Sequence, residues 1–374
     1  MKIAVNTRLL IKDKLEGIGW FTFETFNRIA KNHPEHEFIF IFDRAFSDEF
    51  IFSSNVTPVV IHPQSRHPFL WYIWFEHSLT KRFKKIKPDL FVSPDGFLSL
   101  SSKIPSFAVI HDINFVHQPK DLPFLARKYY NYYFPKYAKK AKRVATVSEF
   151  SKKDLCENYQ LNPDKVDVVY NGVNKIYSPV SESDKKATRE KYANGSDFFV
   201  FVGALHPRKN VSRLLLAFDE FKKSSKSDIK LVVVGDFMFK NKNLKNVYSN
   251  LFYKDDIIFT GRLSPNDLRY VLGSALALTF VPYFEGFGIP IIEAMSCGAP
   301  VITSNVTSMP EVAGDAALLV DPFSVEEIKN AMLKIAKDNN LRNDLIKKGF
   351  VQQEKFSWDK TAEKLWTSIE KCLK

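Results

Sequence analysis

The sequence is poor in cysteine, in long apolar runs and in clustered aspartates. Its three cysteines, Cys156, Cys297 and Cys372, are far apart and odd in number, so neither a disulfide framework nor a paired zinc-ligand spacing is present. No run of about 18 apolar residues is free of charge, which argues against a membrane-spanning helix. The opening MKIAVNTRLL is typical of a buried strand and not of an export signal. We therefore expect a globular protein of the reducing cytoplasm.

The composition predicts two domains and an acidic partner. A chain of 374 residues with 45% hydrophobic residues exceeds one ordinary core and shows no sign of disorder. The formal charge of +12 favours sugar nucleotides, nucleic acid or an anionic membrane surface without choosing among them. The densest basic stretches, Lys81 to Lys87 and Lys136 to Arg143, lie in helix-like patterns. They are either solvated outer faces or a surface that rests on anionic lipid headgroups.

Short apolar runs alternate with helix-like segments through both halves of the chain. Runs rich in Val, Ile and Phe are what strands buried on both faces of a parallel sheet require. The first half predicts strands at 3–6, 38–42, 58–61, 89–92, 107–110, 144–147 and 166–170. The second half predicts strands at 198–202, 230–234, 257–260, 276–281, 301–303 and 317–320. The pattern indicates two doubly wound α/β domains.

Polar residues between Ser178 and Asp197 interrupt this alternation, and we expect the interdomain linker there. After Asp321 the pattern is helical to the end, with a last helix expected near Ser357 to Lys360. Ligands of open parallel sheets bind beyond the carboxyl ends of the strands. Two such sheets would place the chemistry in a cleft between the domains.

The motif EGFGIPIIEAMSCGAP begins at Glu285, follows a predicted strand and contains two carboxylates eight positions apart. Gly286 and Gly288 let a ligand approach the backbone closely, and Pro290 suits the start of a helix. The positive end of that helix would attract a diphosphate. Glu285 could then reach sugar hydroxyls, and Glu293 a ribose. The alternative is an exposed loop carboxylate at Glu285 and a simple complement to the helix dipole at Glu293.

The motif GALHPRKN places Arg208 and Lys209 between a strand and a helix-like run. Adjacent cations near a helix start are disfavoured unless an anion binds there. A bound phosphate would resolve this conflict. Ordinary surface cations in a loop are the alternative.

Two weaker signals lie in the first half. Gly17 and Gly19 precede a helix-like run and could close over phosphate, although a glycine pair is also common in simple turns. His111 and Asp112 follow the strand at 107–110. The histidine could donate a hydrogen bond to a sugar hydroxyl or a leaving group, while Asp112 orients it or meets an acceptor. A histidine satisfied within packed structure is the alternative.

Taken together, the motifs resemble the large retaining GT-B glycosyltransferase family (glycosyltransferase family 4, group 1), and within it bacterial mannosyltransferases of O-antigen and capsule assembly. The most specific part is EGFGIPIIEAMSCGAPVITSN followed by SMPEVAGDAALLVDP. Further segments keep the family's order over nearly the whole chain: GIGWFTFE, HDINF, VATVSEFSKKDL, NGV, GALHPRKN, TGRL and FSWDKTAEK.

The resemblance implies two Rossmann-like domains, an acceptor-binding domain at 1–177 and a nucleotide-sugar-binding domain at 196–357. A C-terminal helix at about 358–374 would cross back to the first domain. Within this fold, Glu285 would hold the donor sugar, Glu293 the ribose, and Arg208 with Lys209 the diphosphate. His111 would contact the transferred sugar and Asp112 the acceptor side. The remaining donor-binding positions implied are Gly17, Gly19, Gly203, Gly235, Asp236, Gly261, Arg262, Leu263, Gly286, Phe287, Gly288 and Ile289.

The resemblance also implies retention at the anomeric carbon, with the acceptor attacking the face that the diphosphate leaves. Cations and helix amides would stabilise the leaving group, so no metal or other cofactor is expected. GDP-mannose is the preferred donor and a UDP-sugar the alternative, with a glycan or lipid-linked acceptor and no nucleic acid partner. A sugar-nucleotide epimerase and a non-catalytic binding protein stay open. Ala204 and Trp20 stand where many relatives have arginine, which leaves the acceptor side open.

The stretch from Phe69 to Lys87 mixes aromatic residues with a basic tail. It could rest on a membrane that carries a lipid-linked glycan. Packing of these aromatic rings against the first sheet is the alternative.

Overall fold

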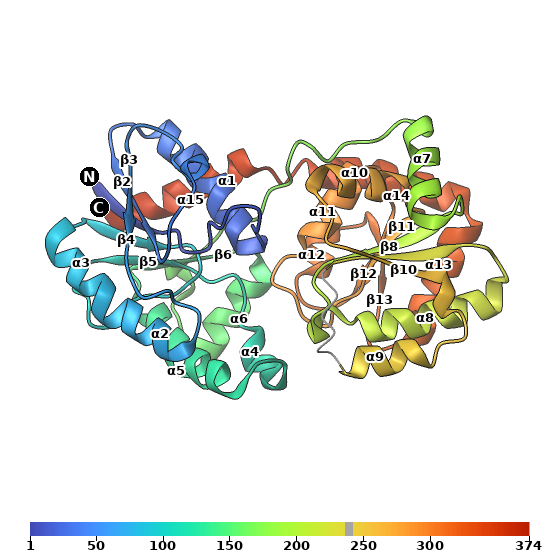
Figure 1. Cartoon of the computed structure of the whole chain (residues 1–374), viewed down its shortest axis with the longest axis horizontal. Helices are drawn as coiled ribbons and strands as arrows, with labels where there is room; N and C mark the ends of the chain where they lie inside the picture. The colour runs from blue at the N-terminus through green and yellow to red at the C-terminus, as the bar shows by residue number, and fades with distance from the viewer. Residues whose placement is uncertain (236–241, 374) are drawn as a thin grey trace. The chain divides into compact units, whose positions relative to one another are not determined.

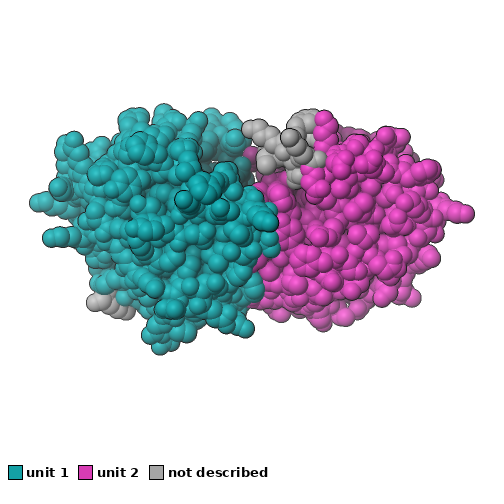
Figure 2. All heavy atoms as spheres, turned by 90° about the horizontal axis from the view of Figure 1, so that it is seen from below, with its two compact units in different colours: residues 1–172, 358–374 teal, residues 173–357 magenta. Residues whose placement is uncertain are grey.

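The computed structural model describes residues 1–235 and 242–373, which form two compact units. Unit 1 comprises Met1–Gly172 and Trp358–Lys374, and unit 2 comprises Val173–Ser357. Figure 2 colours them teal and magenta. Each unit has its own parallel sheet with helices on both faces (Figure 1).

Unit 1 contains a seven-stranded sheet in the order β3-β2-β1-β4-β5-β6-β7. Its strands are β1 (Lys2–Asn6), β2 (Glu37–Phe42), β3 (Val56–Val60), β4 (Leu90–Ser93), β5 (Ser106–Val109), β6 (Arg143–Thr146) and β7 (Val166–Val168). Its helices are α1 (Gly17–Asn32), α2 (Pro68–Tyr72), α3 (Leu79–Ile86), α4 (Asn114–His117), α5 (Phe124–Lys140), α6 (Glu149–Tyr159) and α15 (Trp358–Leu373).

Unit 2 contains a six-stranded sheet in the order β10-β9-β8-β11-β12-β13. Its strands are β8 (Phe198–Val202), β9 (Lys230–Val234), β10 (Ile257–Gly261), β11 (Ala277–Phe280), β12 (Val301–Ser304) and β13 (Ala317–Val320). Its helices are α7 (Glu182–Ala193), α8 (Val211–Ser225), α9 (Lys242–Ser249), α10 (Pro265–Ser274), α11 (Ile289–Ser296), α12 (Met309–Ala313), α13 (Val325–Lys337) and α14 (Asn339–Gln353).

The central strands are buried on both faces, as their continuous apolar runs predict. All five residues of β8 and all four of β11 are buried. Alternation would expose one face, and these runs leave no polar face, so helices must cover both sides. Every strand predicted from the sequence has its counterpart, and the doubly wound α/β prediction is confirmed.

The last helix, α15, packs in unit 1 against α1. Its Thr361 hydroxyl donates to the Tyr170 carbonyl at 2.7 Å, and Lys142 Nζ donates to the Cys372 carbonyl at 2.8 Å. The Trp366 ring stacks on the His33 ring with centroids 4.0 Å apart. The C-terminal helix therefore returns to the first unit, as the GT-B resemblance implies.

The polar stretch predicted as the interdomain linker is not a linker in the structure. Residues 178–197 lie within unit 2 and contain α7 (Glu182–Ala193), while the chain passes between the units at Gly172 and Val173. Ser181 caps this helix, because its hydroxyl accepts from the Asp184 amide at 3.2 Å. Only Thr188 and Ala193 of α7 are buried, so the helix lacks the apolar stripe by which a sequence pattern is identified.

All three cysteines are free thiols. Across residues 1–235 and 242–373, no helix is both long enough and apolar enough to span a bilayer.

Candidate functional site

The strand order of unit 2 reverses between β8 and β11. The chain runs outward through β9 and β10, then returns to the other side of β8 at β11. Open parallel sheets bind ligands outside the carboxyl ends of two strands at such a reversal. The loop after β8 carries Arg208 and Lys209, and the loop after β11 carries Glu285. The two strongest sequence motifs therefore meet where the topology favours a ligand.

The two cations lie in one short helical turn, η5 (Pro207–Lys209), between β8 and α8. Asn210 follows with φ 61°, in the left-handed region that asparagine tolerates. Its buried amide donates to the Val281 carbonyl at 3.0 Å and to the Pro322 carbonyl at 2.6 Å. Asn210 thus ties the cation-bearing loop to the end of β11. Asn210 was not predicted as a site residue, although it directly follows Arg208 and Lys209.

The loop after β11 is held from two sides. Gly288 has φ 97° and precedes α11, which begins at Ile289. A Cβ at this position would lie 2.7 Å from the flexible end of the Met309 side chain, which can move aside, so the positive φ is what favours glycine here. The Ser308 hydroxyl donates to the carbonyl of Glu285 at 2.8 Å and contacts that of Phe287 at 3.3 Å. Ser308 belongs to the SMPEVAG segment and is a positioning residue that the sequence analysis did not identify.

Arg208, Lys209 and Glu285 form one ion cluster. Arg208 Nη1 lies 2.8 Å from Glu285 Oε2, and the Lys209 ammonium donates to the same oxygen. The Glu285 side chain is 12% exposed. Burial would raise the pKa of its carboxyl, but the two cations outweigh burial and lower the pKa to about 2. Glu285 is therefore ionised at every working pH, and the cluster keeps one net positive charge.

Glu293 lies one turn into α11 in a different environment. Burial raises the pKa of its carboxyl to about 7, even though a hydrogen bond from the Tyr177 hydroxyl lowers it. Burial and the Glu293 charge in turn raise the pKa of Tyr177. With a pKa of about 7, this carboxyl group can accept a hydrogen bond from a diol such as a ribose when ionised and donate one when protonated. Tyr177 was not identified from the sequence, because no motif includes it.

Three glycines end neighbouring strands at the same edge of the sheet. Gly203, Gly235 and Gly261 follow or end β8, β9 and β10, with φ of 147°, 153° and 72°. A Cβ on Gly235 would come within 2.0 Å of the Gly203 carbonyl oxygen, so packing alone demands glycine there. Arg262 is exposed and Leu263 half-buried.

These last two predicted residues are not brought to the ion cluster. Arg262 and Leu263 follow β10, which β9 separates from β8 in the sheet. Their predicted contact with the base stays a prediction. Asp236, predicted beside Gly235, lies outside the described residues. Gly286 is buried in the loop between Glu285 and Phe287.

In unit 1 the two predicted glycines, Gly17 and Gly19, differ in their surroundings. Gly17 is the first residue of α1, and a Cβ there would meet nothing within 4 Å. At Gly19 a Cβ would lie 2.9 Å from the Leu9 carbonyl oxygen and 3.2 Å from Leu15 Cδ2. Gly19 is therefore required by packing, whereas Gly17 leaves room for a ligand at the positive end of a 16-residue helix.

His111 follows β5 and is fixed by its surroundings. Its Nε2 lies 2.9 Å from the Pro94 carbonyl, which can only accept, so this nitrogen carries the proton. Burial lowers the pKa of the ring, which also meets the edge of Phe21. A neutral ring of this tautomer offers Nδ1 as an acceptor for a sugar hydroxyl, instead of the donor role predicted. Asp112 accepts from the Asn114 amide at 3.1 Å and so shapes the start of α4.

A buried ion pair beside this histidine was not identified from the sequence. The order of unit 1 reverses between β1 and β4, and Arg8 and Asp95 follow these two strands. Arg8 Nε lies 2.6 Å from Asp95 Oδ2, with side chains 8% and 4% exposed. Asn6 also donates to Asp95 at 2.8 Å. Pro94, the acceptor of His111, adjoins this pair, so the network positions the histidine. The sequence feature that could have indicated this pair is the position of Arg8 and Asp95 shortly after two predicted strands.

The arrangement in unit 2 is suited to an anionic ligand with hydroxyl groups. Two cations and the positive end of α11 can stabilise a diphosphate. The ionised Glu285 beside them can accept hydrogen bonds from hydroxyls on whatever that diphosphate carries, but it cannot act as an acid. Among the described residues, no three His, Cys, Asp or Glu side chains gather in a group that could hold a metal ion.

Two family descriptions match consecutive parts of the chain. Residues 16–175 match "Glycosyltransferase Family 4", and residues 183–352 match "Glycosyl transferases group 1". The chain is 26% identical to the O-antigen chain mannosyltransferase B of Escherichia coli, over 96% of this chain and 97% of that protein. It is 31% identical to the O-antigen chain mannosyltransferase RfbU of Salmonella typhimurium, over 60% of this chain and 59% of that one.

A solved structure shares the whole fold. HepE from Anabaena, in complex with UDP-glucose, superposes with a TM-score of 0.76 at 17% identity, over 99% of this chain and 100% of that chain. At this identity the likeness shows the fold alone. With both halves matched to one family in the right order, the chain belongs to the group 1, family 4 glycosyltransferases and is an enzyme with the GT-B fold.

Proposed function

We propose that this enzyme transfers a hexose, by preference mannose from GDP-mannose, to a glycan or lipid-linked oligosaccharide in surface-polysaccharide assembly. The observation that carries the proposal is the cluster of Arg208, Lys209 and Glu285 at the strand reversal of unit 2. A nucleotide diphosphate would take the two cations, and the attached hexose would lie against the carboxylate. The names of the two O-antigen mannosyltransferase relatives support the sugar and the pathway class.

In the proposed reaction the acceptor oxygen attacks the anomeric carbon on the face from which the diphosphate leaves. Arg208, Lys209 and the start of α11 stabilise the negative charge that builds on the leaving group. Glu285 holds the hexose close to the anomeric centre, where its charge opposes the positive charge of an oxocarbenium-like state. His111 contacts the transferred sugar. Configuration at the anomeric carbon is retained.

Metal independence is part of the proposal. Two fixed cations and a helix dipole supply the stabilisation that a divalent ion gives other transferases. Turnover in excess chelator is expected to equal turnover without it. A loss of activity that added magnesium or manganese restores would contradict this part.

A thermal-shift titration with GDP and UDP tests which base the sugar donor carries. Binding of a ligand to the folded state raises the melting temperature, and at equal concentration the tighter ligand raises it more. We expect GDP to stabilise the enzyme more than UDP at equal concentration, and mannose transfer from GDP-mannose to follow. Greater stabilisation by UDP would favour a UDP-sugar donor. We retain this alternative because the similarly folded HepE was solved in complex with UDP-glucose.

Two alternative functions can be distinguished from glycosyl transfer by simple assays. A sugar-nucleotide epimerase would convert the donor without an acceptor, so an epimer in a donor-only incubation would favour it. A non-catalytic binding protein would keep its physiological role in the variants His111→Ala and Glu285→Ala. We expect no epimer and a loss of that role.

A further inference from the structure

The aromatic segment from Phe69 to Lys87 divides between the core and the surface. Four of its side chains are buried in the core of unit 1, namely Trp74, Phe75, Leu79 and Phe83, each 4% exposed or less, and Trp71 and Ile86 pack against that core partly buried. Phe69 and Tyr72 are 66% and 39% exposed. Packing therefore explains most of the aromatic rings of the segment, and its exposed Phe and Tyr rings are confined to α2.

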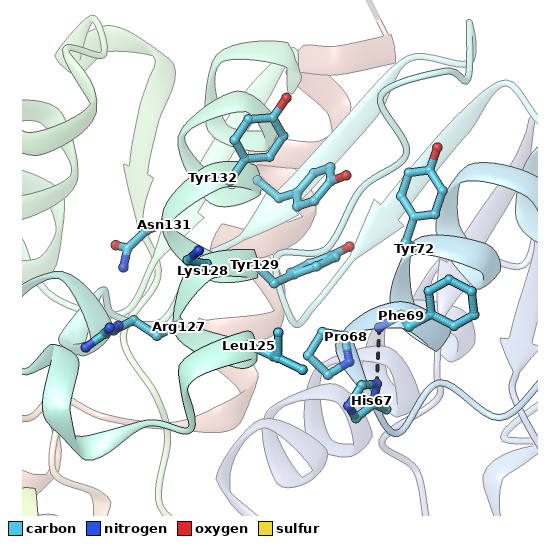
Figure 3. A pocket seen from close by; sticks show the side chains of 11 residues that line it. His67, Pro68, Phe69, Tyr72, Leu125, Arg127, Lys128, Tyr129, Asn131 and Tyr132 are labelled. Carbon is cyan, nitrogen blue, oxygen red and sulfur yellow. Dashed lines mark hydrogen bonds between the residues drawn. The ribbon is translucent and has the colours of Figure 1, made fainter.

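These exposed rings border a hollow of about 850 Å³ between α2 and α5. Figure 3 shows Phe69 and Tyr72 on one wall and Leu125, Tyr129 and Tyr132 on the other. The lining also includes Pro68 and Tyr133, so most of the wall is carbon. A hollow of this size accommodates a ligand of several hundred daltons or a lipid chain.

Five large exposed side chains form what we call the α2–α5 patch: four of them line this hollow, and the fifth, Phe124, directly precedes the lining residue Leu125. They are 39–66% exposed: Phe69, Tyr72, Phe124, Leu125 and Tyr132. Exposed apolar side chains scattered singly need no explanation, but a gathered set around a hollow marks an interaction site.

Cations accompany the patch. Arg127 and Lys128 line the hollow, and none of its eleven described lining residues is Asp or Glu. The Lys128 ammonium lies 4.5 Å from the Phe124 ring centroid, and that of Lys136 lies 3.3 Å from the Tyr132 ring centroid. Each of these cations therefore borders an exposed aromatic ring. This combination of apolar and aromatic side chains with lysine and arginine is typical of a surface that binds at the membrane interface.

We propose that the α2–α5 patch docks unit 1 on an anionic lipid bilayer, with an acyl chain of one lipid entering the hollow and Arg127 and Lys128 meeting its phosphate. The rings would insert at the level of the headgroups, where aromatic side chains are most stable. The inference rests on the proposed function only in that a lipid-linked acceptor is found at a membrane.

Other occupants fit the patch less well. A glycan needs several hydrogen-bonding groups along the wall, and this wall is mostly hydrocarbon. A second copy of the chain would bring Lys128, Arg127 and Lys136 against the same cations in a two-fold contact, and like charges repel. An anionic bilayer complements both the rings and the cations.

Vesicle sedimentation without any donor tests the proposal. At low salt the protein is expected to bind vesicles of phosphatidylglycerol and phosphatidylcholine, and to bind phosphatidylcholine alone weakly. The variant Arg127→Gln/Lys128→Gln should bind anionic vesicles about 30-fold more weakly, from roughly one tenfold step per 1.4 kcal/mol and about 1 kcal/mol per cation. Phe69→Ala/Phe124→Ala should reduce binding at least about tenfold, because two aromatic rings no longer insert.

Matched controls come from elsewhere on the surface. Phe252→Ala removes a ring that is 77% exposed in unit 2, and Lys84→Gln/Lys85→Gln removes two exposed cations of α3. Both should bind vesicles like the parent. Equal losses in the controls, or no binding by the parent, would overturn the proposal. So would a dimer in sedimentation velocity that Phe69→Ala/Phe124→Ala abolishes, since the occupant would then be a second copy.

The proposed function is assayed separately on the same variants. Their stabilisation by GDP and their transfer to a water-soluble acceptor should equal those of the parent. If vesicle binding fails while these persist, the docking proposal falls and the transferase proposal stands.

Discussion

Glu285 is the residue on which the electrostatics of the proposed donor site depend. In the substitution Glu285→Gln the shape is kept, and Arg208 and Lys209 lose the carboxylate that neutralises one of their two charges. We expect the dissociation constant of GDP to stay equal or fall, since a more positive site attracts a diphosphate more strongly. Turnover should fall about 100-fold or more, because the charge beside the anomeric centre is lost. Calorimetric titration and a transfer assay measure the two effects.

A carboxylate outside the site provides the comparison. Glu326 on α13 is exposed and pairs with Lys329, so Glu326→Gln should change neither quantity. Weaker GDP binding together with normal turnover in Glu285→Gln would reverse the roles assigned to these residues.

Glu293 makes stability depend on pH. Its pKa is about 7 in the folded protein and 4.5 ordinarily, so between these values the folded state binds more protons than the unfolded state. Stability contributed by this residue is therefore present below pH 4.5 and is lost as pH rises to about 7. Relative to the parent, Glu293→Gln should gain on the order of 2 kcal/mol of unfolding free energy between pH 4.5 and pH 8.

Denaturant unfolding at several pH values measures this gain. Tyr177→Phe removes the hydrogen bond that lowers the Glu293 pKa, so the pH at which stability declines should move upward. A stability difference that is the same at all pH values would show that Glu293 does not titrate in this range.

At the scale of elements, the two glycines of α1 allow packing and the proposed ligand contact to be tested separately. Gly19→Ala would push a methyl against the Leu9 carbonyl and the Leu15 side chain, and we expect a loss of about 1–3 kcal/mol in stability. Gly17→Ala has open space and should leave stability nearly unchanged. If a substrate phosphate or acceptor approaches the start of α1, Gly17→Ala should instead raise a Michaelis constant.

Denaturant unfolding measures the stability of each glycine variant, and steady-state kinetics measures its Michaelis constants. A large stability loss in Gly17→Ala with none in Gly19→Ala would contradict the packing described for this helix start. Unchanged kinetics in Gly17→Ala would remove Gly17 from the proposed site.

The strands of both sheets could be predicted because continuous apolar runs are typical of strands buried on both faces. The site loops could be placed because their motifs directly follow two of these strands. EGFG and RKN were therefore placed correctly after β11 and β8. Contacts that depend on three-dimensional neighbours could not be predicted: Ser308 under the loop of Glu285, Tyr177 on Glu293, and Arg8 on Asp95. Helix α7 was missed for the opposite reason, since a helix with two buried residues leaves almost no periodic signal.

At the scale of the whole molecule, α15 completes unit 1 from the far end of the chain. Trp366 is 5% exposed and stacks on His33, so Trp366→Ala should cost about 3–5 kcal/mol. The loss should be confined to unit 1, and GDP binding by unit 2 should persist. Hydrogen exchange read by mass spectrometry can assign the loss of protection to β6, α1 and α15.

A surface substitution in the other unit is the control. Leu319 on β13 is 41% exposed, and Leu319→Ala should alter exchange in neither unit. If Trp366→Ala loosened both units equally, the division of the chain at residues 172 and 357 would not describe its cooperative behaviour.

The return of α15 also sets an order for synthesis on the ribosome. Residues 173–357 emerge before α15 is translated, so unit 2 can finish folding while the nascent unit 1 still lacks its last helix. Until then the surface of α1 that α15 covers stays open to chaperones and to other nascent chains. Premature termination late in the message would therefore release a folded unit 2 attached to a unit 1 that lacks its last helix.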